Sequence, residues 1–463
     1  MSDRIDDLGT DPTRQFLDEL DDAGYASLSS RAVSDDARAF TDYLTGIIAT
    51  WERQSDKWQR QRSIDKVRAA VEAFVGDLLL ALDNGRSGWV YRSVRPTSFS
   101  GEHVSSRIFR RVLEGLKATE LGQHLPGSQY WADFGDGAPV VSRQRAPRFR
   151  AAPKLLVLAA QGGITSATVS NHFTPGLPQH PLVLKTTSRR VGAGKDKGKR
   201  MPLPRTARAA ELEDQIRMLN EFLDNFTLRG GTHRGFVRVF NNADDEGFDW
   251  NMGGRLYSAG KDSYQTLGED ERLNMTIDGE VVCEIDIRAS YLTILHVRNH
   301  VPFTVSKEDD PYHIAGLDRF VVKNWIVICL GSKELPQRWP AKVRSEYSKQ
   351  RDGRNLSKDY PIKGVGRMVI EKFPLLGRWS DLPDTWATLM CQESKAILKT
   401  MLGLMSSDIP SFPVHDSIIV PASQETVACE LLSNHYREIC GAIPALVVRQ
   451  STPNSVCQGL RKA

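Results

Sequence analysis

Two aspartates far apart in the chain each interrupt a run of strand-forming residues. Asp286 lies in VVCEIDIRASYLTIL (281–295), and Asp416 lies in SFPVHDSIIVPAS (411–423). A carboxylate at the end of an apolar strand is costly to bury unless it is paired or binds a cation. Strands from distant segments can converge in one sheet, and two carboxylates there suit two-metal phosphoryl chemistry. We therefore predict that Asp286 and Asp416 bind two Mg²⁺ ions, with Mn²⁺ as an alternative metal.

A pair of cations lies between the two aspartates. Arg319 and Lys323 are four residues apart in DRFVVKNWIVICLGS (318–332), whose apolar residues have helical spacing. Such spacing puts both cations on one face of a helix, which suits the triphosphate tail of a nucleotide. Each feature alone has a plainer interpretation. The cations also fit a solvated helix face, and Asp286 also fits a cap of the helix that follows its strand.

Five segments, in chain order, resemble motifs of palm-domain nucleic-acid polymerases, most closely family A DNA polymerases and the phage-type single-subunit RNA polymerases. The matching segments are GGRLYSAG (253–260, like T-G-R-L-S-S), EIDIRASYLTIL (284–295, motif A), DRFVVKNWIVICLGS (motif B), CQESKAILKTML (391–402, like Q-G-x-A-A-D-I-I-K) and VHDS (414–417, motif C). Their order is that of family A, and the resemblance extends from about residue 235 to about residue 450.

The resemblance implies a mechanism of nucleotidyl transfer. Asp286 and Asp416 would be the metal ligands, as the aspartates of motifs A and C are in these polymerases. Lys323, assisted by Arg319, would neutralise and protonate the leaving phosphates. The partners of the chain would then be primer-template DNA and dNTPs.

The same resemblance implies that four further residues contact the substrate. Tyr291 stands five positions after the motif A aspartate, at the place that screens the sugar 2′ position, so we expect selection of dNTPs. Arg255 would contact the primer terminus or the incoming phosphates, and Gln392 the template or primer. His415 is grouped with these substrate-binding residues. Tyr291 also fits a core aromatic residue in the helix after the strand.

The motifs also depart from the family A pattern. Leu330 and Gly331 stand, one position early, where the family A fingers helix has an aromatic residue and a glycine, and motif A lacks the family A glutamate. Ser417 follows the motif C aspartate where family A DNA polymerases have glutamate, as in the phage RNA polymerases. The string around Tyr291 is closer to the family B pattern. We interpret the chain as a divergent, compact bacterial, phage or plasmid branch.

The residues before these motifs predict a DNA-binding unit. Helical spacing over 64–82 and 103–118 is followed by a candidate β-ribbon over 130–150 with a basic second arm. The order of helix, basic helix and basic hairpin is typical of a winged-helix module. Its expected DNA contacts are three arginines of the second helix, Arg107, Arg110 and Arg111.

A strongly basic segment follows. Residues 185–208 carry nine basic side chains and a single acidic one, with three glycines and two prolines, so we expect a flexible loop of net charge +8. A nucleic acid would favour this single-sign charge through counterion release. Affinity for DNA should fall steeply with salt, and deleting 189–200 should weaken that dependence. The expected contacts are Arg189, Arg190, Lys195, Lys197, Lys199 and Arg200.

Composition constrains the environment of the protein. Of its 463 residues, 40% are hydrophobic, and the net charge of +4 includes an acidic leader of net charge −7 over residues 1–36, which we expect to be partly disordered. The six cysteines lie at least eleven positions apart, which predicts buried reduced thiols. No segment has the length and apolarity of a membrane span, and the start lacks a secretory signal, so we expect a cytoplasmic protein without membrane contact.

The expected fold is α+β, a right-hand polymerase core of palm, fingers and thumb preceded by a helical, winged-helix-like N-terminal domain. The expected divisions are a leader (1–60), the winged-helix-like domain (61–180), the basic loop with a thumb-like helix (181–234), and palm and fingers (235–463). No acidic cluster typical of a proofreading exonuclease is visible. The predicted function is template-directed DNA polymerase. The alternatives are a primase or RNA polymerase of the same fold, or a non-catalytic DNA-binding replication initiator.

Overall fold

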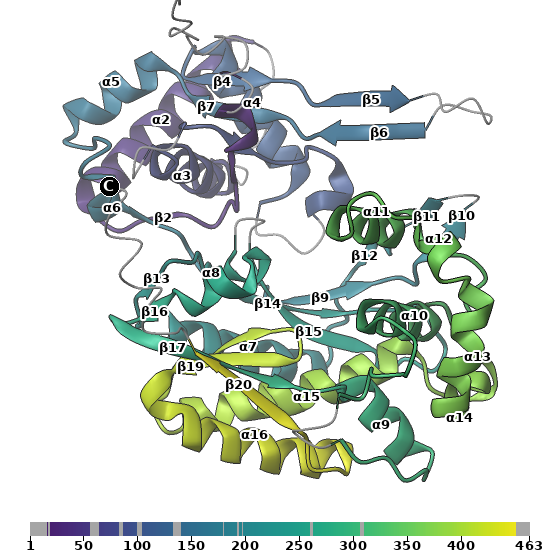
Figure 1. Ribbon diagram of the computed structural model, residues 1–463. Helices are drawn as coiled ribbons and strands as arrows, with labels where there is room; N and C mark the ends of the chain where they lie inside the picture. Colours follow the sequence, from purple (N-terminus) through teal and green to yellow (C-terminus); the bar gives the residue numbers. More distant parts are fainter. Residues whose placement is uncertain are drawn as a thin grey trace, which may run out of the picture.

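A computed structural model shows a mixed α+β chain with several small sheets (Figure 1). It describes residues 16, 19–55, 64–82, 87–99, 104–132, 140–178, 180–191, 194–196, 198–259, 263–305 and 310–450. Residues 1–15, 17 and 18 of the acidic leader, and Lys197, lie outside the described residues. Within them, no helix is long and apolar enough to cross a membrane. The five cysteines described there are free thiols, four of them buried, as their spacing predicts.

An N-terminal unit extends from residue 24 to residue 174. Its helices are α2 (Asp35–Gln54), α3 (Ile64–Leu80), α4 (Ser106–Ala118), α5 (Pro153–Gln161) and α6 (Val169–His172). Its strands are β1 (Gly24–Tyr25), β2 (Arg31–Ala32), β3 (Val90–Tyr91), β4 (Gly122–Leu125), β5 (Ser128–Ala132), β6 (Val140–Arg145), β7 (Arg148–Ala151) and β8 (Phe173–Thr174). The rings of Phe74, Phe109 and Phe149 meet edge to face in its core, with centroids 5.0 to 6.0 Å apart.

Strand pairing and helix packing determine which parts of the unit are exposed. Strands β3 and β4 both pair antiparallel with β7, and β5 and β6 form a hairpin that projects from the unit (Figure 1). Ser105 caps α4, which buries Phe109, Val112 and Leu116. The opposite face of α4 is therefore free to carry basic residues. Helix α2 packs on α3 and α4, so this core begins before residue 61.

A second sheet and a long helix follow. The strand order is β12 (Arg200–Met201), β9 (Leu182–Lys185), β14 (Phe236–Phe240) and β15 (Gly253–Ser258). Helix α7 (Ala207–Leu223) packs on β9 and β14, and the Thr206 hydroxyl caps its first turn. The expected loop at 185–208 is instead partly a hairpin, β10 (Arg189–Val191) with β11 (Gly194–Asp196), and β12 joins the sheet. Backbone pairing thus orders a segment whose glycines and charges predicted a loop.

The largest sheet lies in the C-terminal half. Its strand order is β13 (Leu228–Arg229), β16 (Thr276–Ile277), β17 (Glu280–Ile287), β19 (Ser417–Pro421) and β18 (Phe412–Val414), and β20 (Leu446–Gln450) also pairs with β17. Helices α15 (Trp386–Met405) and α16 (Glu425–Cys440) cover one face of it (Figure 1), α9 (Ser290–Arg298) packs on α15, and the short α8 (Glu269–Leu273) contacts β17. Apart from the exposed Val281, the apolar residues of β17 and β19 are buried, which explains their strand composition.

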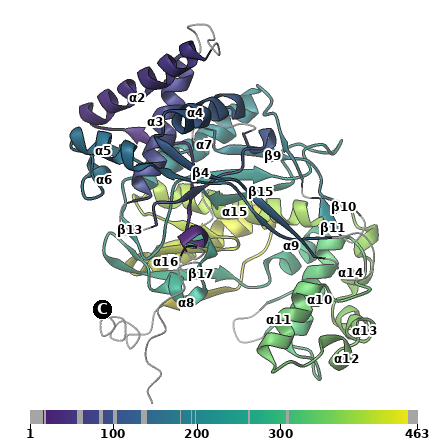
Figure 2. The ribbon, with the colours of Figure 1, turned by 90° about the horizontal axis from the view of Figure 1, so that it is seen from above.

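A lobe of helices stands beside this sheet (Figures 1 and 2). It comprises α10 (Arg319–Ser332), α11 (Ala341–Gln350), α12 (Leu356–Asp359), α13 (Ile362–Lys372) and α14 (Pro374–Gly377). Helix α10 buries Trp325 against Gly366 of α13, where an added Cβ would lie 3.0 Å from the indole ring. The side of α10 that carries Arg319 and Lys323 stays exposed.

Candidate active site

The two predicted aspartates lie side by side, Asp286 on β17 and Asp416 in the turn just before β19. Strands β17 and β19 pair antiparallel with Asp286 opposite Ser417, and the Ile287 amide donates to the Asp416 carbonyl at 3.2 Å. Asp416 and His415 form the turn of the β18–β19 hairpin, and His415 adopts φ +60°, an uncommon backbone conformation outside glycine. Segments 130 residues apart in sequence thus meet in one sheet, as their composition predicts.

The surroundings of Asp286 favour a bound cation. Its side chain is 29% exposed, and burial together with the charge of Asp416 raises the pKa of its carboxyl to about 6. Arg449 Nη1 lies 3.8 Å from Asp286 Oδ2 and lowers that pKa only in part. Among the described residues, no group of three or more His, Cys, Asp or Glu side chains is arranged to hold a metal. Mg²⁺ fits two carboxylates because water and substrate phosphates supply its other ligands.

Glu284, two positions before Asp286 on β17, is bound by the protein itself. Arg272 Nε and Nη2 donate to its two carboxylate oxygens, both at 2.9 Å, and the Ser417 hydroxyl donates to Oε1 at 2.7 Å. Glu284 and Ser417 are both buried. Glu284 therefore stabilises the strand pair beneath the aspartates, and Ser417 is occupied in the same network.

Helix α10 brings the cation pair toward the aspartates. Lys323 is exposed, and its charge lowers the pKa of Asp286, which places it within electrostatic reach of that carboxylate. Arg319 is exposed at the start of the helix. Its Nε donates to Asp310 at 2.7 Å, and its Cζ lies 5.4 Å from the centre of the Tyr312 ring. Arg319 is therefore held by a neighbouring carboxylate that an anionic ligand would have to replace.

Three elements bring Arg255, Tyr291 and Glu393 together. Arg255 of β15 binds the Glu393 carboxylate of α15 through Nη2 and through Nε, the latter at 3.2 Å. Its Cζ lies 5.6 Å from the centre of the Tyr291 ring of α9. Burial raises the pKa of Glu393 to about 7, although Arg255 lowers it. Gly254 has φ +85°, and an added Cβ would lie 3.2 Å from the Ser394 hydroxyl, so glycine lets β15 approach α15 closely.

The other two predicted substrate residues lie beside this cluster. The His415 ring centroid is 6.4 Å from that of Tyr257, and partial burial, then the charge of Arg255, lowers the pKa of His415. Its imidazole is therefore neutral at pH 7, able to accept or donate one hydrogen bond. Gln392 is half-buried on α15, directly before Glu393.

The predicted DNA-contacting cations of α4 divide into two kinds. Arg107 and Arg110 are exposed, and Arg110 donates to the Val94 carbonyl at 3.1 Å. Arg111 instead forms an ion pair with Glu52, whose side chain is 2% exposed. Its guanidinium is thus bound inside the N-terminal unit, because the helical spacing turns it toward α2.

The cations of the basic segment lie on or next to short strands. Arg189 and Arg190 belong to β10, where their backbones pair with Asp196 and Lys195 of β11. Lys199 is exposed, and Arg200 is half-buried on β12. The backbone of the segment therefore forms a hairpin, β10 with β11, between β9 and β12 in the chain.

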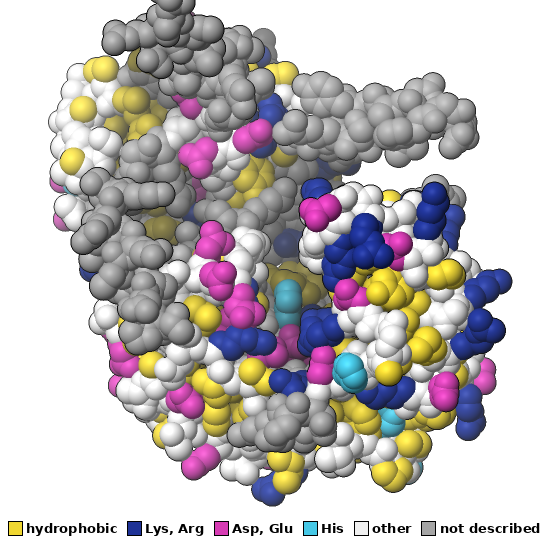
Figure 3. Space-filling model, viewed as in Figure 1, with side chains coloured by type: hydrophobic (Ala, Val, Ile, Leu, Met, Phe, Trp, Pro, Cys, Tyr) yellow, Lys and Arg dark blue, Asp and Glu magenta, His cyan; other side chains and the backbone are white. Residues whose placement is uncertain are grey.

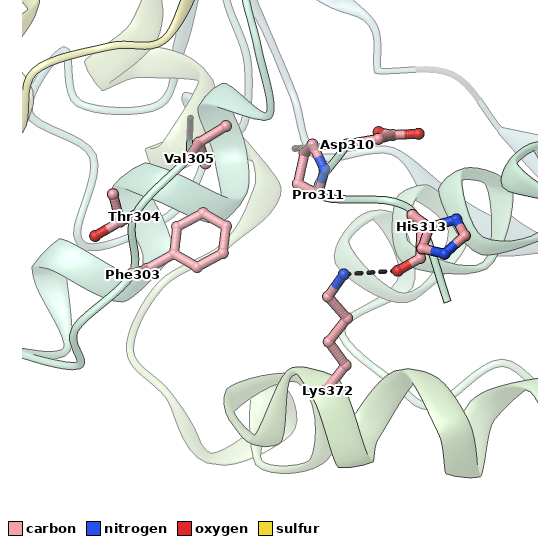
Figure 4. Close-up of a pocket in the computed structure, with 7 residues that line it drawn as sticks. All are labelled: Phe303, Thr304, Val305, Asp310, Pro311, His313 and Lys372. Carbon is pink, nitrogen blue, oxygen red and sulfur yellow. Dashed lines mark hydrogen bonds between the residues drawn. The ribbon is translucent and has the colours of Figure 1, made fainter. Parts of the chain in front are cut away.

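The face of the molecule in Figure 3 is hollowed near its centre, where acidic side chains lie between Lys and Arg side chains. A cavity of about 570 Å³ opens nearby, between the segment after α9 and the helical lobe (Figure 4). It is lined by Phe303, Thr304, Val305, Asp310, Pro311, His313 and Lys372. Lys372 donates to the His313 carbonyl at 2.7 Å across it. Because Asp310 also binds Arg319, this cavity borders the predicted triphosphate contacts.

Three residues near the aspartates were not predicted: Glu393, Tyr312 and Arg449. Burial, followed by the charge of Asp416, raises the pKa of the Tyr312 hydroxyl to about 12, which indicates that Tyr312 lies near the aspartate pair. Arg449 lies on β20, a strand with no recognisable motif. Of these three residues, only Glu393 could have been found from the sequence. A glutamate on the packed side of an apolar helix requires a partner, which marks it as a candidate site residue.

Comparisons with known proteins identify no family. The sequence matches no protein-family model and no curated protein. Among solved structures, the chain is similar to the POL domain of Pol1 from M. smegmatis in complex with DNA primer-template and dNTP, with 9% identity and a TM-score of 0.27. The alignment covers 94% of this chain and 68% of that one. A TM-score of 0.27 marks a distant likeness that assigns no function to this chain.

Proposed function

We propose that the protein is a template-directed DNA polymerase that adds dNTPs to a primer 3′ end by two-metal-ion nucleotidyl transfer, without a proofreading exonuclease. One observation carries the proposal: Asp286 on β17 and Asp416 in the turn before β19 lie side by side, with Lys323 within electrostatic reach. Two Mg²⁺ ions bound there would lower the pKa of the primer 3′ hydroxyl and stabilise the leaving pyrophosphate.

The protein side chains have three tasks in this proposal. The strand pair fixes the spacing of the two carboxylates before metal and substrate arrive. Lys323 and Arg319 neutralise the leaving phosphates, with Lys323 as the proton donor. Arg319 exchanges its Asp310 contact for the triphosphate, so binding of the nucleotide would loosen the segment that carries Asp310.

Sugar selection is assigned to Tyr291. The ring would lie under the sugar and clash with a 2′ hydroxyl, so Tyr291→Ala should increase ribonucleotide incorporation. DNA would be held by the exposed arginines of α4 and by the basic segment at 185–208, through phosphate contacts that salt weakens.

The decisive experiment is extension of a labelled primer-template with Mg²⁺ and dNTPs. Asp286→Ala and Asp416→Ala should each reduce extension by roughly 10³-fold or more, because each removes a metal ligand, while DNA binding persists. Asp270→Ala, an exposed acid of α8, is the matched control and should extend normally. Normal extension by either variant would contradict the assignment.

The same assay separates the alternative functions. Extension with dNTPs supports a DNA polymerase, whereas extension with rNTPs supports an RNA polymerase. Products on a bare single strand would support a primase. DNA binding without any product, in Mg²⁺ and in Mn²⁺, would support a replication initiator and would overturn the proposal.

A further inference from the structure

The contacts of Arg255 form a chain across three elements. Its guanidinium binds Glu393 through Nε and Nη2, and its Cζ lies over the Tyr291 ring, 5.6 Å from the ring centre. The side chain of Arg255 is only 15% exposed, and that of Glu393 is 1% exposed. A planar cation held at its edge by a buried carboxylate has little freedom to move away from the ring.

Glu393 lies in the segment CQESKAILKTML, where the resemblance gives it no role, yet it is buried deep in the site. Burying a carboxylate without a partner costs several kcal/mol. Helix α15 carries Glu393 into contact with β15, and α9 packs on α15, so the glutamate sits where the helices and the strand meet. A site that only needed Arg255 exposed to substrate would not require this buried acid.

We propose that Glu393 is a positioning residue for sugar selection, because it holds Arg255 against Tyr291 and so fixes the ring that screens the 2′ position. This inference rests on the proposed polymerase function. Discrimination between dNTPs and rNTPs then depends on an ion pair between β15 and α15, and not on the bulk of Tyr291 alone.

The geometry distinguishes this role from a direct contact with substrate. Glu393 is enclosed, whereas Tyr291 and Arg255 keep partial exposure. Loss of the Glu393 charge would release the guanidinium and let the Tyr291 ring change orientation. The cation–π contact is worth enough for a change of roughly 3- to 30-fold in selectivity.

The test measures incorporation of a single nucleotide by the full chain on a primer-template. The kcat/KM for an rNTP is divided by the kcat/KM for the dNTP with the same base. Glu393→Gln keeps the size of the side chain and removes its charge. We expect the ratio of rNTP to dNTP to rise roughly 3- to 30-fold. Arg255→Lys keeps the charge and removes the planar fork, and the ratio should rise similarly.

Glu438→Gln is the matched control. Glu438 is exposed and pairs with Lys399 on the outer side of α15 and α16, so the same chemical change there should leave the ratio unaltered. A double variant tests whether the effect of Glu393 on selectivity depends on Tyr291. If Glu393 acts through Tyr291, Glu393→Gln should add nothing to the ratio already raised by Tyr291→Ala.

The outcomes separate the two proposals. A wild-type chain that extends no primer contradicts the polymerase function and, with it, this inference. A wild-type chain that extends and selects dNTPs, with a ratio unchanged in folded Glu393→Gln and Arg255→Lys, overturns the inference alone. An effect of Glu393→Gln that persists in full without Tyr291 would also overturn it.

Discussion

Two buried carboxylates of the N-terminal unit, Glu52 and Asp77, differ from the aspartate pair of the C-terminal sheet in the partners that the chain gives them. In the N-terminal unit, Glu52 is bound at both oxygens by Arg111. Asp77 is buried and accepts hydrogen bonds from the Leu28 amide at 2.7 Å and the Ser30 hydroxyl at 2.6 Å. Each acid has partners within the chain, although burial still raises the pKa of the Asp77 carboxyl.

In the C-terminal sheet, Asp286 and Asp416 lie side by side. Asp286 has a cation only at 3.8 Å, and its pKa is raised to about 6. Such an arrangement destabilises the fold at neutral pH unless a ligand neutralises it. Glu52 and Asp77 are therefore bound by groups within the fold, whereas the Asp286 and Asp416 pair is suited to a cation from outside the chain.

The largest effect should follow from breaking a satisfied pair. Arg111→Ala leaves Glu52 buried without its cation, and we expect a loss of about 3 to 5 kcal/mol in the free energy of unfolding of the N-terminal unit. Urea denaturation followed by far-UV circular dichroism measures it. Lys117→Ala, an exposed cation of the same helix, should change stability by less than about 0.5 kcal/mol.

A small effect of Arg111→Ala on stability, with a large loss of DNA affinity, would reverse the assignment. Arg111 would then face DNA, as its place on a basic helix predicts, and Glu52 would be accommodated without it. Equal urea midpoints for Arg111→Ala and Lys117→Ala would be the clearest form of that result.

At the aspartate pair, we expect a substitution to raise the free energy of unfolding and not to lower it. The folded pKa of Asp286, about 6, lies above the unfolded value of 3.8, so ionisation of this carboxyl disfavours folding. In the presence of EDTA at pH 8, Asp286→Asn should therefore stabilise the protein by up to about 3 kcal/mol. The gain should shrink as pH falls through 6, and vanish below about pH 4.

Urea denaturation at pH 8, 6 and 4 checks this pH profile. Asp270→Asn, on the exposed face of α8, should give no stability change at any of these pH values. An Asp286→Asn variant that is less stable than wild type at pH 8 would show that the carboxylate is satisfied in the folded state. The contrast between the two regions would then fail.

Much of the site was predictable because strands and helices carry local signals. The apolar runs around Asp286 and Asp416 predict strands, and the i, i+4 spacing predicts that Arg319 and Lys323 share a face of α10. The pairing of the two strands also follows from the need to bury their apolar residues together. The strand and helix predictions depend on residues close together in the sequence, and the burial of their apolar residues then brings the two distant strands together.

The remainder depends on contacts between distant elements. Glu393 meets Arg255 only because α15 packs on β15, and no local pattern encodes that packing. The sequence shows the charge of Arg111, which predicts a contact with DNA. It does not show that this residue pairs with the buried Glu52 of another helix. The basic segment formed a hairpin because strand pairing outweighed its glycines.

A smaller effect should accompany metal binding. If Mg²⁺ neutralises the aspartate pair, a concentration about ten times its Kd should stabilise the wild type by about 1.4 kcal/mol, or roughly 1 to 2 °C in Tm. Asp286→Asn and Asp416→Asn should lose this shift, and Asp270→Asn should keep it. Differential scanning fluorimetry with Mg²⁺ or EDTA measures it, and equal shifts in all four proteins would place the metal elsewhere.

The smallest effect concerns the exposed face of the N-terminal unit. Arg107→Ala should weaken DNA binding by a few-fold and reduce the slope of log Kd against log salt by about 1, because one phosphate contact is lost. Fluorescence anisotropy with labelled duplex DNA at several salt concentrations gives the slope. Lys66→Ala, an exposed cation of α3, provides the comparison. If both variants reduce the slope equally, the charge of the whole unit attracts DNA, and α4 has no special part in binding it.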